Sequence, residues 1–250
     1  MFCNRKTALV VLFSMFKEKE YQFKGRYYNI AYIDPSPYHA SWFTFEDESS
    51  VRDAQWSISF NECVFDVGAA YGSYSLTALA VGASKVYAWS PQGEVGLPAE
   101  REFFRESLKL NGWEDKCVIY DSGVYDKAGW LNALTQEFSI AEPTEFNNDI
   151  IKVDQLDLWY ENVFLKTDKK ENHSGFWLKL DVEGAEVEVL KSSSKLIKDL
   201  KPRITLENHV FKRATIEQEV RDVLVGYGYR EIMTTPYHSV SHSLYIPNVL

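Results

Sequence analysis

Short apolar runs alternate with amphipathic segments along most of the chain after residue 60. The apolar runs have the length and the content of branched and aromatic residues that are typical of buried strands. They cover residues 63–67, 85–89, 117–120, 176–180 and 203–206. Segments with helical periodicity lie between or after them, at 74–81, at 98–110, around Val187, Leu190 and Leu196, and after Thr215. Strands that alternate with helices predict a parallel, doubly wound α/β sheet that binds ligands at the carboxyl ends of its strands.

Turn and cap residues limit these elements. Gly82 stops the first helix, and Thr215 with Gln218 forms a capping-box pattern for the last one. Two further strands are expected near 229–233 and 243–246. The turn-rich stretch between them is short for a crossover helix, so this last pair is expected to be an antiparallel hairpin.

The length of 250 residues suits one α/β domain. We expect residues 56–250 to form it and residues 1–55 to be an N-terminal extension that packs on the core. Aromatic residues are concentrated in this extension: Tyr27, Tyr28, Tyr32, Tyr38, Trp42, Phe43 and Phe45. They are ordinary strand formers, so strands that cap the sheet are favoured over a surface that stacks on sugar rings.

An apolar run at 7–16 follows Arg5-Lys6 and so resembles a signal peptide. The run is too short to span a bilayer, and charged residues 17–20 stand where a small-residue cleavage site belongs. A docked N-terminal helix is therefore favoured over an export signal, and no transmembrane segment is expected.

The composition limits which binding partners and which cellular compartment are expected for the protein. The formal net charge is −9 at pH 7, so no broad contact with nucleic-acid phosphates is expected. The three cysteines lack metal-ligand spacing, and Cys63 and Cys117 lie in predicted strands, which indicates reduced core thiols and a cytoplasmic location. No pair of carboxylates or histidines has metal-ligand spacing, so no dedicated metal is expected. No feature of the sequence specifies the oligomeric state.

A glycine-bearing turn follows the first core strand. The strand ends at Asp66, and Gly68 and Gly72 follow with the spacing G-x-x-x-G. We expect the absence of a Cβ at Gly68 to let the backbone approach a ligand, and Gly72 to let helix and strand pack closely. This spacing suits a nucleoside without a pyrophosphate, whereas nicotinamide enzymes need G-x-G-x-x-G and an acid after the second strand. The simpler alternative is an ordinary strand-to-helix turn.

A second polar segment lies at the end of the fourth strand. Lys179 and Asp181 share a face of that strand by alternation, and are expected to form an ion pair at the edge of the site. A carboxylate at the carboxyl end of a central parallel strand, such as that of Asp181, indicates a functional role. Glu183 and Glu186 are expected in the first helical turn, where the alternative to a chemical role is a favourable interaction with the helix dipole.

Together, F-D-V-G-A-A-Y-G-S-Y and L-K-L-D-V-E-G-A-E-V-E-V-L-K resemble the FkbM-type S-adenosylmethionine-dependent methyltransferases, over about residues 61–246. The resemblance implies a Rossmann-like class I methyltransferase fold: a mostly parallel seven-stranded sheet, helices on both faces and an antiparallel last strand. It also implies S-adenosylmethionine as cofactor. The implied reaction is methylation of a hydroxyl oxygen on a sugar, glycoconjugate or related small molecule.

The resemblance assigns roles to individual residues. The implied cofactor-binding residues are Asp66, Gly68, Ala69, Tyr71, Gly72, Ser90, Asp121 and Asp181. The implied catalytic residues are Asp181, Glu183 and His209, beside the transferred methyl group and the acceptor. Glu207 is expected to face the same cleft, and His238 and His242 are alternative bases.

One position departs from the family pattern. The family ends its second strand with F-E-P, whose glutamate binds the ribose hydroxyls, whereas this chain has Trp89-Ser90-Pro91. A charge-assisted hydrogen bond contributes about 1.5–3 kcal/mol and a neutral one about 1 kcal/mol, so the change predicts roughly tenfold weaker binding. Gln92 or Glu94 is a substitute contact to the ribose. The serine also motivates the alternative function, a binding or scaffold protein that has lost catalysis.

Overall fold

The structure is a computed structural model that describes residues 17–23, 26–32, 58–91, 100–132, 138–140, 150–168 and 170–248. Side chains are described from residue 58 onward, except that of Glu100. Several predictions therefore lie outside the described residues: the apolar run at 7–16, the aromatic residues Tyr38, Trp42, Phe43 and Phe45, and the substitute contacts Gln92 and Glu94.

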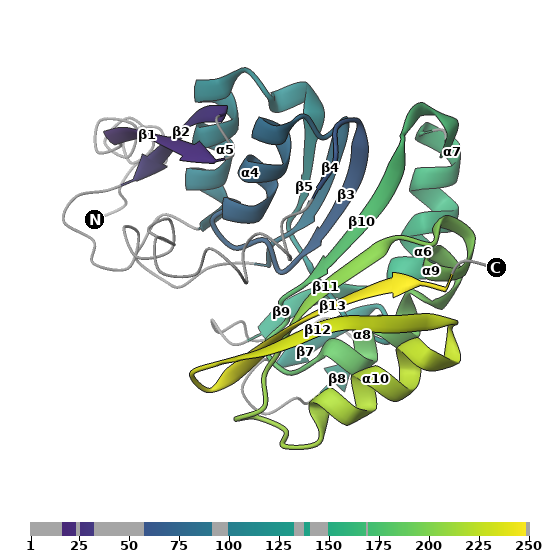
Figure 1. The fold of residues 1–250 in the computed structure, drawn as a ribbon. Helices are drawn as coiled ribbons and strands as arrows, with labels where there is room; N and C mark the ends of the chain where they lie inside the picture. Colours follow the sequence, from purple (N-terminus) through teal and green to yellow (C-terminus); the bar gives the residue numbers. More distant parts are fainter. Residues whose placement is uncertain are drawn as a thin grey trace, which may run out of the picture.

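Seven strands form the central sheet, in the order β12-β13-β11-β10-β3-β4-β5 (Figure 1). They are β3 (Glu62–Val67), β4 (Lys85–Trp89), β5 (Cys117–Tyr120), β10 (Gly175–Leu180), β11 (Arg203–Asn208), β12 (Tyr229–Tyr237) and β13 (Val240–Pro247). β13 runs antiparallel to both of its neighbours, and the other adjacent pairs are parallel. The predicted mostly parallel sheet with an antiparallel last strand is confirmed.

Helices cover both faces of this sheet (Figure 1). On one face lie α4 (Ser73–Val81) and α5 (Glu100–Asn111). On the other lie α6 (Leu156–Trp159), α8 (Glu186–Ser192), α9 (Ser194–Leu200) and α10 (Ile216–Gly226). Because both faces are covered, every residue of β3 is buried, which explains why its sequence is a continuous apolar run interrupted only where polar groups have partners.

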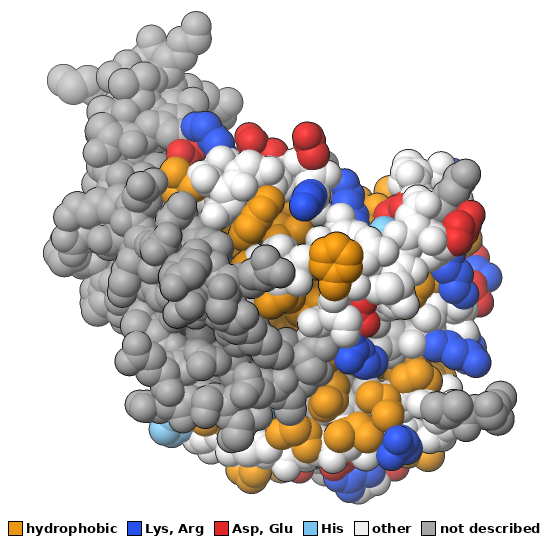
Figure 2. Space-filling model, turned by 45° about the horizontal axis from the view of Figure 1, so that its top comes forward, with side chains coloured by type: hydrophobic (Ala, Val, Ile, Leu, Met, Phe, Trp, Pro, Cys, Tyr) orange, Lys and Arg blue, Asp and Glu red, His pale blue; other side chains and the backbone are white. Residues whose placement is uncertain are grey.

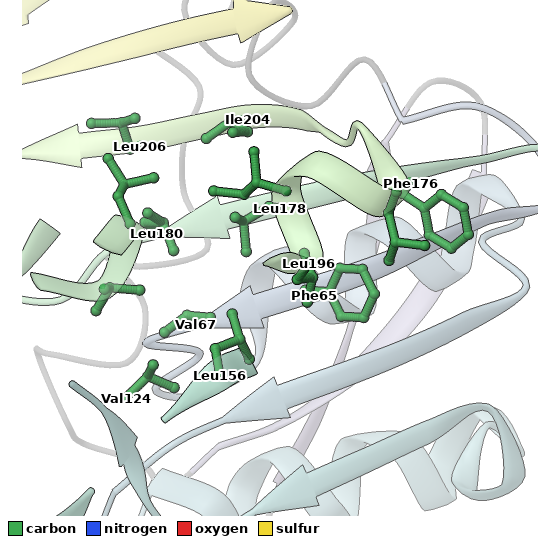
Figure 3. Packing of buried hydrophobic residues seen from close by; sticks show 14 of the residues in the cluster. Phe65, Val67, Val124, Leu156, Phe176, Leu178, Leu180, Leu196, Ile204 and Leu206 are labelled. Carbon is green, nitrogen blue, oxygen red and sulfur yellow. The ribbon is translucent and has the colours of Figure 1, made fainter. Parts of the chain in front are cut away.

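Strand alternation assigns the core residues to the two faces. Val64 and Trp177 pack with α4 and α5, whereas Phe65 and Leu178 face the opposite helical layer. In that second layer, side chains of β3, β10 and β11 pack together with Leu156 and Leu196 (Figure 3). The predicted core thiols Cys63 and Cys117 are both free and buried.

Between Tyr120 and Phe176, where the sequence pattern predicted no element, the chain forms a second, four-stranded sheet in the order β6-β9-β7-β8. The strands are β6 (Gly123–Val124), β7 (Gly129–Asn132), β8 (Phe138–Ser139) and β9 (Ile150–Asp154). A helical segment follows, made of α6, a π-helical turn η3 (Tyr160–Phe164) and α7 (Leu165–Thr167). β6 and β8 have two residues each, Asn132 ends β7 and Lys152 interrupts β9, so none of them shows the continuous apolar run of the predicted strands.

Three predicted details were wrong. The helix after the fourth strand is two helices, α8 and α9, interrupted at Ser193, whose hydroxyl donates to the Val189 carbonyl. The last hairpin is longer than expected, because the stretch at 234–242 is mostly strand around a turn at His238, which has a φ of 50°. Thr215 precedes α10, but its hydroxyl donates to the Glu219 carboxylate instead of capping the backbone.

At the N-terminal side, β1 (Lys17–Phe23) and β2 (Arg26–Tyr32) pair as a separate antiparallel sheet. β2 lies against α5 and α4, so these strands add to the helical layer and not to the central sheet (Figure 1). Among the described residues, no helix combines the length and apolar character that crossing a membrane requires. On the face drawn in Figure 2, Lys and Arg side chains are scattered among acidic and hydrophobic ones.

Candidate active site at the carboxyl ends of the central strands

The glycine turn joins β3 to α4 at the carboxyl end of the sheet. Gly68, Ala70 and Gly72 all have positive φ values, of 82°, 46° and 80°. A Cβ added to Gly68 would overlap the carbonyl oxygen of Asp181, and one added to Gly72 would overlap the Phe104 ring of α5. Gly68 thus makes room for the backbone after β10, and Gly72 makes room for the neighbouring helix α5 and not for its own strand. The expected approach of a ligand to Gly68 stays a prediction.

Asp66 lies beneath this turn. Its carboxylate is fully buried, accepts a hydrogen bond of 2.6 Å from the Ser75 hydroxyl, and lies 3.3 Å from the Lys179 ammonium. Lys179 donates to the Gly68 carbonyl at 2.6 Å and lies 3.5 Å from Asp181, which confirms the predicted ion pair. Burial opposes the charge of Lys179, but Asp66 and Asp181 outweigh it and raise the lysine pKa. Asp66 thus holds Ser75 and Lys179, and Lys179 in turn binds the carbonyl of Gly68 in the turn.

Four further ionisable side chains meet where β10 and β11 end. The His209 Nε2 atom lies 3.7 Å from Asp181, 3.6 Å from Glu183 and 3.6 Å from Glu207. On its other side, His209 Nδ1 lies 2.6 Å from Glu186. The structure therefore brings together the three residues predicted as catalytic, Asp181, Glu183 and His209.

The two helix-turn glutamates differ from their prediction. Glu183 precedes α8 in a left-handed turn with a φ of 56°, and Lys212 donates to its carboxylate at 2.6 Å. Glu186 does begin α8, but it is fully buried against His209 and also accepts from the Gly184 amide at 3.0 Å. Glu186 is therefore a buried partner of His209. The prediction had named only a favourable interaction with the helix dipole as the alternative to a chemical role.

The charges in this cluster shift one another. Burial opposes the charged form of His209, but Glu183 and Glu186 outweigh it and raise the histidine pKa to about 10. Conversely, His209 and Lys212 lower the pKa of Glu183 to about 2. Burial and the charge of Asp181 raise the pKa of Glu207 to about 7. Perturbed carboxyl and imidazole groups gathered at the end of a parallel sheet are typical of a functional site.

The end of the second strand is arranged differently. Ser90 is fully buried, and its hydroxyl donates to the Ala70 carbonyl at 3.3 Å. Asp121, after β5, forms ion pairs with Arg101 at 3.1 Å and Arg105 at 2.8 Å. The serine thus faces the glycine turn, and Asp121 is engaged by the two arginines.

The profile of the methyltransferase FkbM domain family matches residues 66–231, which include the glycine turn, β10 and β11. The chain belongs to this family. The matched range contains every residue predicted to bind the cofactor or to act in catalysis. Of the alternative bases, both outside this range, His242 lies 3.8 Å from Glu207 and His238 is exposed at the hairpin turn.

Solved structures agree with the class I methyltransferase fold of this FkbM domain. The crystal structure of methyltransferase FkbM from Methylobacillus flagellatus KT is similar, with a TM-score of 0.53 and 16% sequence identity. The match covers 74% of this chain and 43% of that protein, so this chain spans less than half of its length.

Two further structures resemble the chain less closely. Precorrin-6y C5,15-methyltransferase from Geobacter metallireducens GS-15 has a TM-score of 0.46 and 12% identity, over 81% of this chain and 88% of that one. Ribosomal protein L11 methylase from Lactobacillus delbrueckii subsp. bulgaricus has a TM-score of 0.46 and 10% identity, over 82% and 81%. A search of curated protein sequences gave no match.

Two residues of the FkbM domain site were not among the predicted catalytic set. Glu207 was expected to face the cleft, and His209, two residues further along, lies 3.6 Å from it. Its contact with His242 depends on the pairing of β11 with β13, which places these two residues opposite each other. Glu186 was expected at the helix start, and its burial was not expected. The available signal was the L-E-N-H segment, in which charged residues directly follow an apolar strand.

A second polar group of the FkbM domain lies at the amino ends of β4 and β10, opposite the glycine turn. His173 contacts the Ser84 hydroxyl at 2.7 Å and Asp168 at 3.1 Å, and the Tyr87 hydroxyl donates to Asp168 at 2.9 Å. These residues line a pocket of about 500 Å³. The Ser84 hydroxyl also donates to two backbone carbonyls, of Asn61 and Glu62, so this group ties loops together.

Proposed function

We propose that this FkbM domain transfers a methyl group from S-adenosylmethionine to a hydroxyl oxygen of a sugar, a glycoconjugate or a related small molecule. The observation that carries the proposal is the contact between the glycine turn and the end of β10, where Gly68 abuts Asp181 beside Glu207 and His209. The glycine turn and a group of ionisable side chains thus share one edge of the sheet, where doubly wound folds bind their ligands.

The residues fit the amino-acid half of S-adenosylmethionine. The Asp181 side chain is 28% exposed beside the glycine turn, so its carboxylate is accessible to the ammonium group of a ligand. Lys179, held by Asp66 and Asp181, provides a positive charge near the same turn. Ser90 stands where the family pattern has the acid for the ribose, and it is fully buried with its hydroxyl donated to Ala70. Roughly tenfold weaker binding than in relatives with the acid therefore stays a prediction.

The chain's own residues would align the acceptor and remove its proton. S-adenosylmethionine, when bound, supplies an already activated methyl group, so the protein mainly positions the acceptor oxygen in line with it. Asp181 and Glu207 offer carboxylate oxygens to an acceptor hydroxyl, and His209 keeps both within 3.7 Å of its Nε2 atom. Two neighbouring hydroxyl groups of a sugar could each donate a hydrogen bond to one of these two carboxylates.

A second candidate is a ligand-binding protein of the same fold without catalysis. It is favoured by the inward-facing Ser90 and by the Arg101–Asp121–Arg105 ion pairs, because no acid within the described residues is free for a ribose there.

Calorimetric titration with S-adenosylhomocysteine tests the proposal. We expect saturable, micromolar binding to the wild-type chain and markedly weaker binding to Asp181→Asn, which removes the carboxylate but keeps the side-chain shape. Asp222→Asn on α10 is the matched control, because Asp222 is exposed and its carboxylate accepts a hydrogen bond of 2.7 Å from Gln218 on the same helix. Binding would justify a labelled-methyl screen of sugar acceptors. No binding at millimolar ligand would contradict the proposal.

A further inference from the structure

We propose that Asp181, Glu207 and His209 form a binding site for a divalent cation at the carboxyl ends of β10 and β11. One potential ligand atom from each side chain lies within 4.8 Å of the other two. Ligand atoms that share one ion at about 2.0–2.3 Å lie roughly 3 Å apart, so small side-chain rotations suffice to close the site. Spacing along the sequence argued against a metal, but the parallel pairing of β10 with β11 brings these distant residues together.

The environment of His209 points to a ligand independently of the acids. The imidazole is 2% exposed, and its Nδ1 atom contacts the fully buried carboxylate of Glu186 at 2.6 Å. Within the described part of the chain, Nε2 has no partner closer than 3.6 Å and faces three carboxylates, of Asp181, Glu183 and Glu207, at 3.6–3.7 Å. Metal-ligating histidines characteristically place their second ring nitrogen against a carboxylate, which fixes the ring. Because the surrounding acids raise the pKa of His209 to about 10, an ion that binds at Nε2 must displace the proton there.

The charge balance favours a bound cation. Five carboxylates gather around the site, against three basic groups. The acids are Asp66, Asp181, Glu183, Glu186 and Glu207, and the basic groups are Lys179, His209 and Lys212. Lys212 is engaged by Glu183 at 2.6 Å, and Lys179 is shared between Asp66 at 3.3 Å and Asp181 at 3.5 Å. The charge of Glu207 is therefore opposed only by histidines and by this shared lysine among its described neighbours.

The ligand set indicates the kind of ion. Two carboxylates and one imidazole suit Mn²⁺ or Zn²⁺, whereas Mg²⁺ prefers oxygen ligands throughout. Three protein ligands leave coordination positions open to other molecules. A role for the ion in orienting the acceptor rests on the proposed function: an open position beside the glycine turn would take a hydroxyl oxygen of the acceptor and orient it toward the methyl donor.

The test uses the full chain stripped of metal with EDTA. Titration with MnCl₂, followed by loss of the free Mn²⁺ signal in electron paramagnetic resonance, is expected to show one tight site. ZnCl₂ is expected to compete for it, and MgCl₂ to compete poorly. Asp181→Asn and Glu207→Gln are expected to weaken Mn²⁺ binding by about tenfold or more, since even residues behind the ligands contribute that much. Circular dichroism verifies that each variant is folded.

Glu188→Gln on α8 is the matched control. Its carboxylate pairs with Arg213 at 3.2 Å, so its removal is expected to change Mn²⁺ affinity little. Absence of Mn²⁺ and Zn²⁺ binding to the wild-type chain would overturn the inference, as would equal binding by all the variants. S-adenosylhomocysteine binding is measured separately on the metal-free chain, so a failed metal site and a failed cofactor site give different results.

Discussion

At the scale of single residues, the buried pair of Glu186 and His209 determines the shape of the site. Neither side chain has appreciable solvent contact, and their closest atoms are 2.6 Å apart. Such a pair adds little net stability by itself, but removal of one member leaves the other charged and buried. Its role is to aim the second nitrogen of the histidine at Asp181 and Glu207.

Glu186→Ala is expected to lower the free energy of unfolding by about 3 kcal/mol, because His209 loses its nearest counter-charge inside the protein. Urea denaturation measures the change. Glu188→Ala on the same helix is the control, since Glu188 pairs with Arg213 nearer the surface, at 3.2 Å. Its expected cost is below about 1 kcal/mol. Equal losses for the two variants would argue against a special role for Glu186.

Gly68 offers a second test at this scale. Gly68→Ala places a methyl group on the Asp181 carbonyl and forces a side chain onto a backbone with a φ of 82°, so both stability and cofactor binding are expected to fall. Gly226→Ala at the end of α10 is the control, because nothing lies within 4 Å of its added Cβ. That change is expected to leave stability unaltered or raise it by about 0.5–1 kcal/mol. Thermal unfolding of both variants measures these two changes in stability.

At the scale of elements, a continuous apolar sequence separates the strands that were predicted from those that were missed. β4 and β5 coincide with the predicted runs at 85–89 and 117–120, because buried strands between helical layers need continuous apolar residues. The small sheet of β6, β7, β8 and β9 was missed, because its strands pair outside the main core and are only partly buried. A strand of two residues has no periodicity to read.

The loops at the amino ends of β4 and β10 are connected by His173, whose side chain is 4% exposed between Ser84 and Asp168. His173→Ala is expected to cost about 1–3 kcal/mol of stability, because it removes two hydrogen bonds and leaves buried polar partners. S-adenosylhomocysteine affinity is expected to be unchanged, because this group lies at the opposite end of the sheet. A large loss of affinity in a folded His173→Ala chain would show that the two ends are coupled.

At the scale of the whole molecule, the central sheet has two chemically different ends. At the amino end, Arg203 and Glu62 join the starts of β11 and β3 at 2.6 Å, and His173 ties neighbouring loops. At the carboxyl end, the glycine turn, Asp181, Glu207 and His209 meet. The two halves of this site are 115 residues apart in sequence, from Asp66 to Asp181, and only the strand order unites them.

That distance explains which parts of the site the sequence could predict. The glycine turn and the Lys179–Asp181 pair follow from local pattern, since strand alternation alone places both side chains on one face. The contact of Gly68 with Asp181 requires β3 and β10 to be neighbours, and the contact of Glu207 with His242 requires the antiparallel register of β11 and β13. The periodicity of the sequence predicts neither the adjacency of β3 and β10 nor the register of β11 and β13.

A crystal structure of the chain grown with S-adenosylhomocysteine tests the central claim most directly. The account predicts ligand density along the Gly68–Gly72 turn, with the amino-acid group within hydrogen-bond distance of Asp181 and the ribose near Ser90. Density elsewhere on the molecule, or a site left empty at ligand concentrations that saturate related methyltransferases, would contradict it.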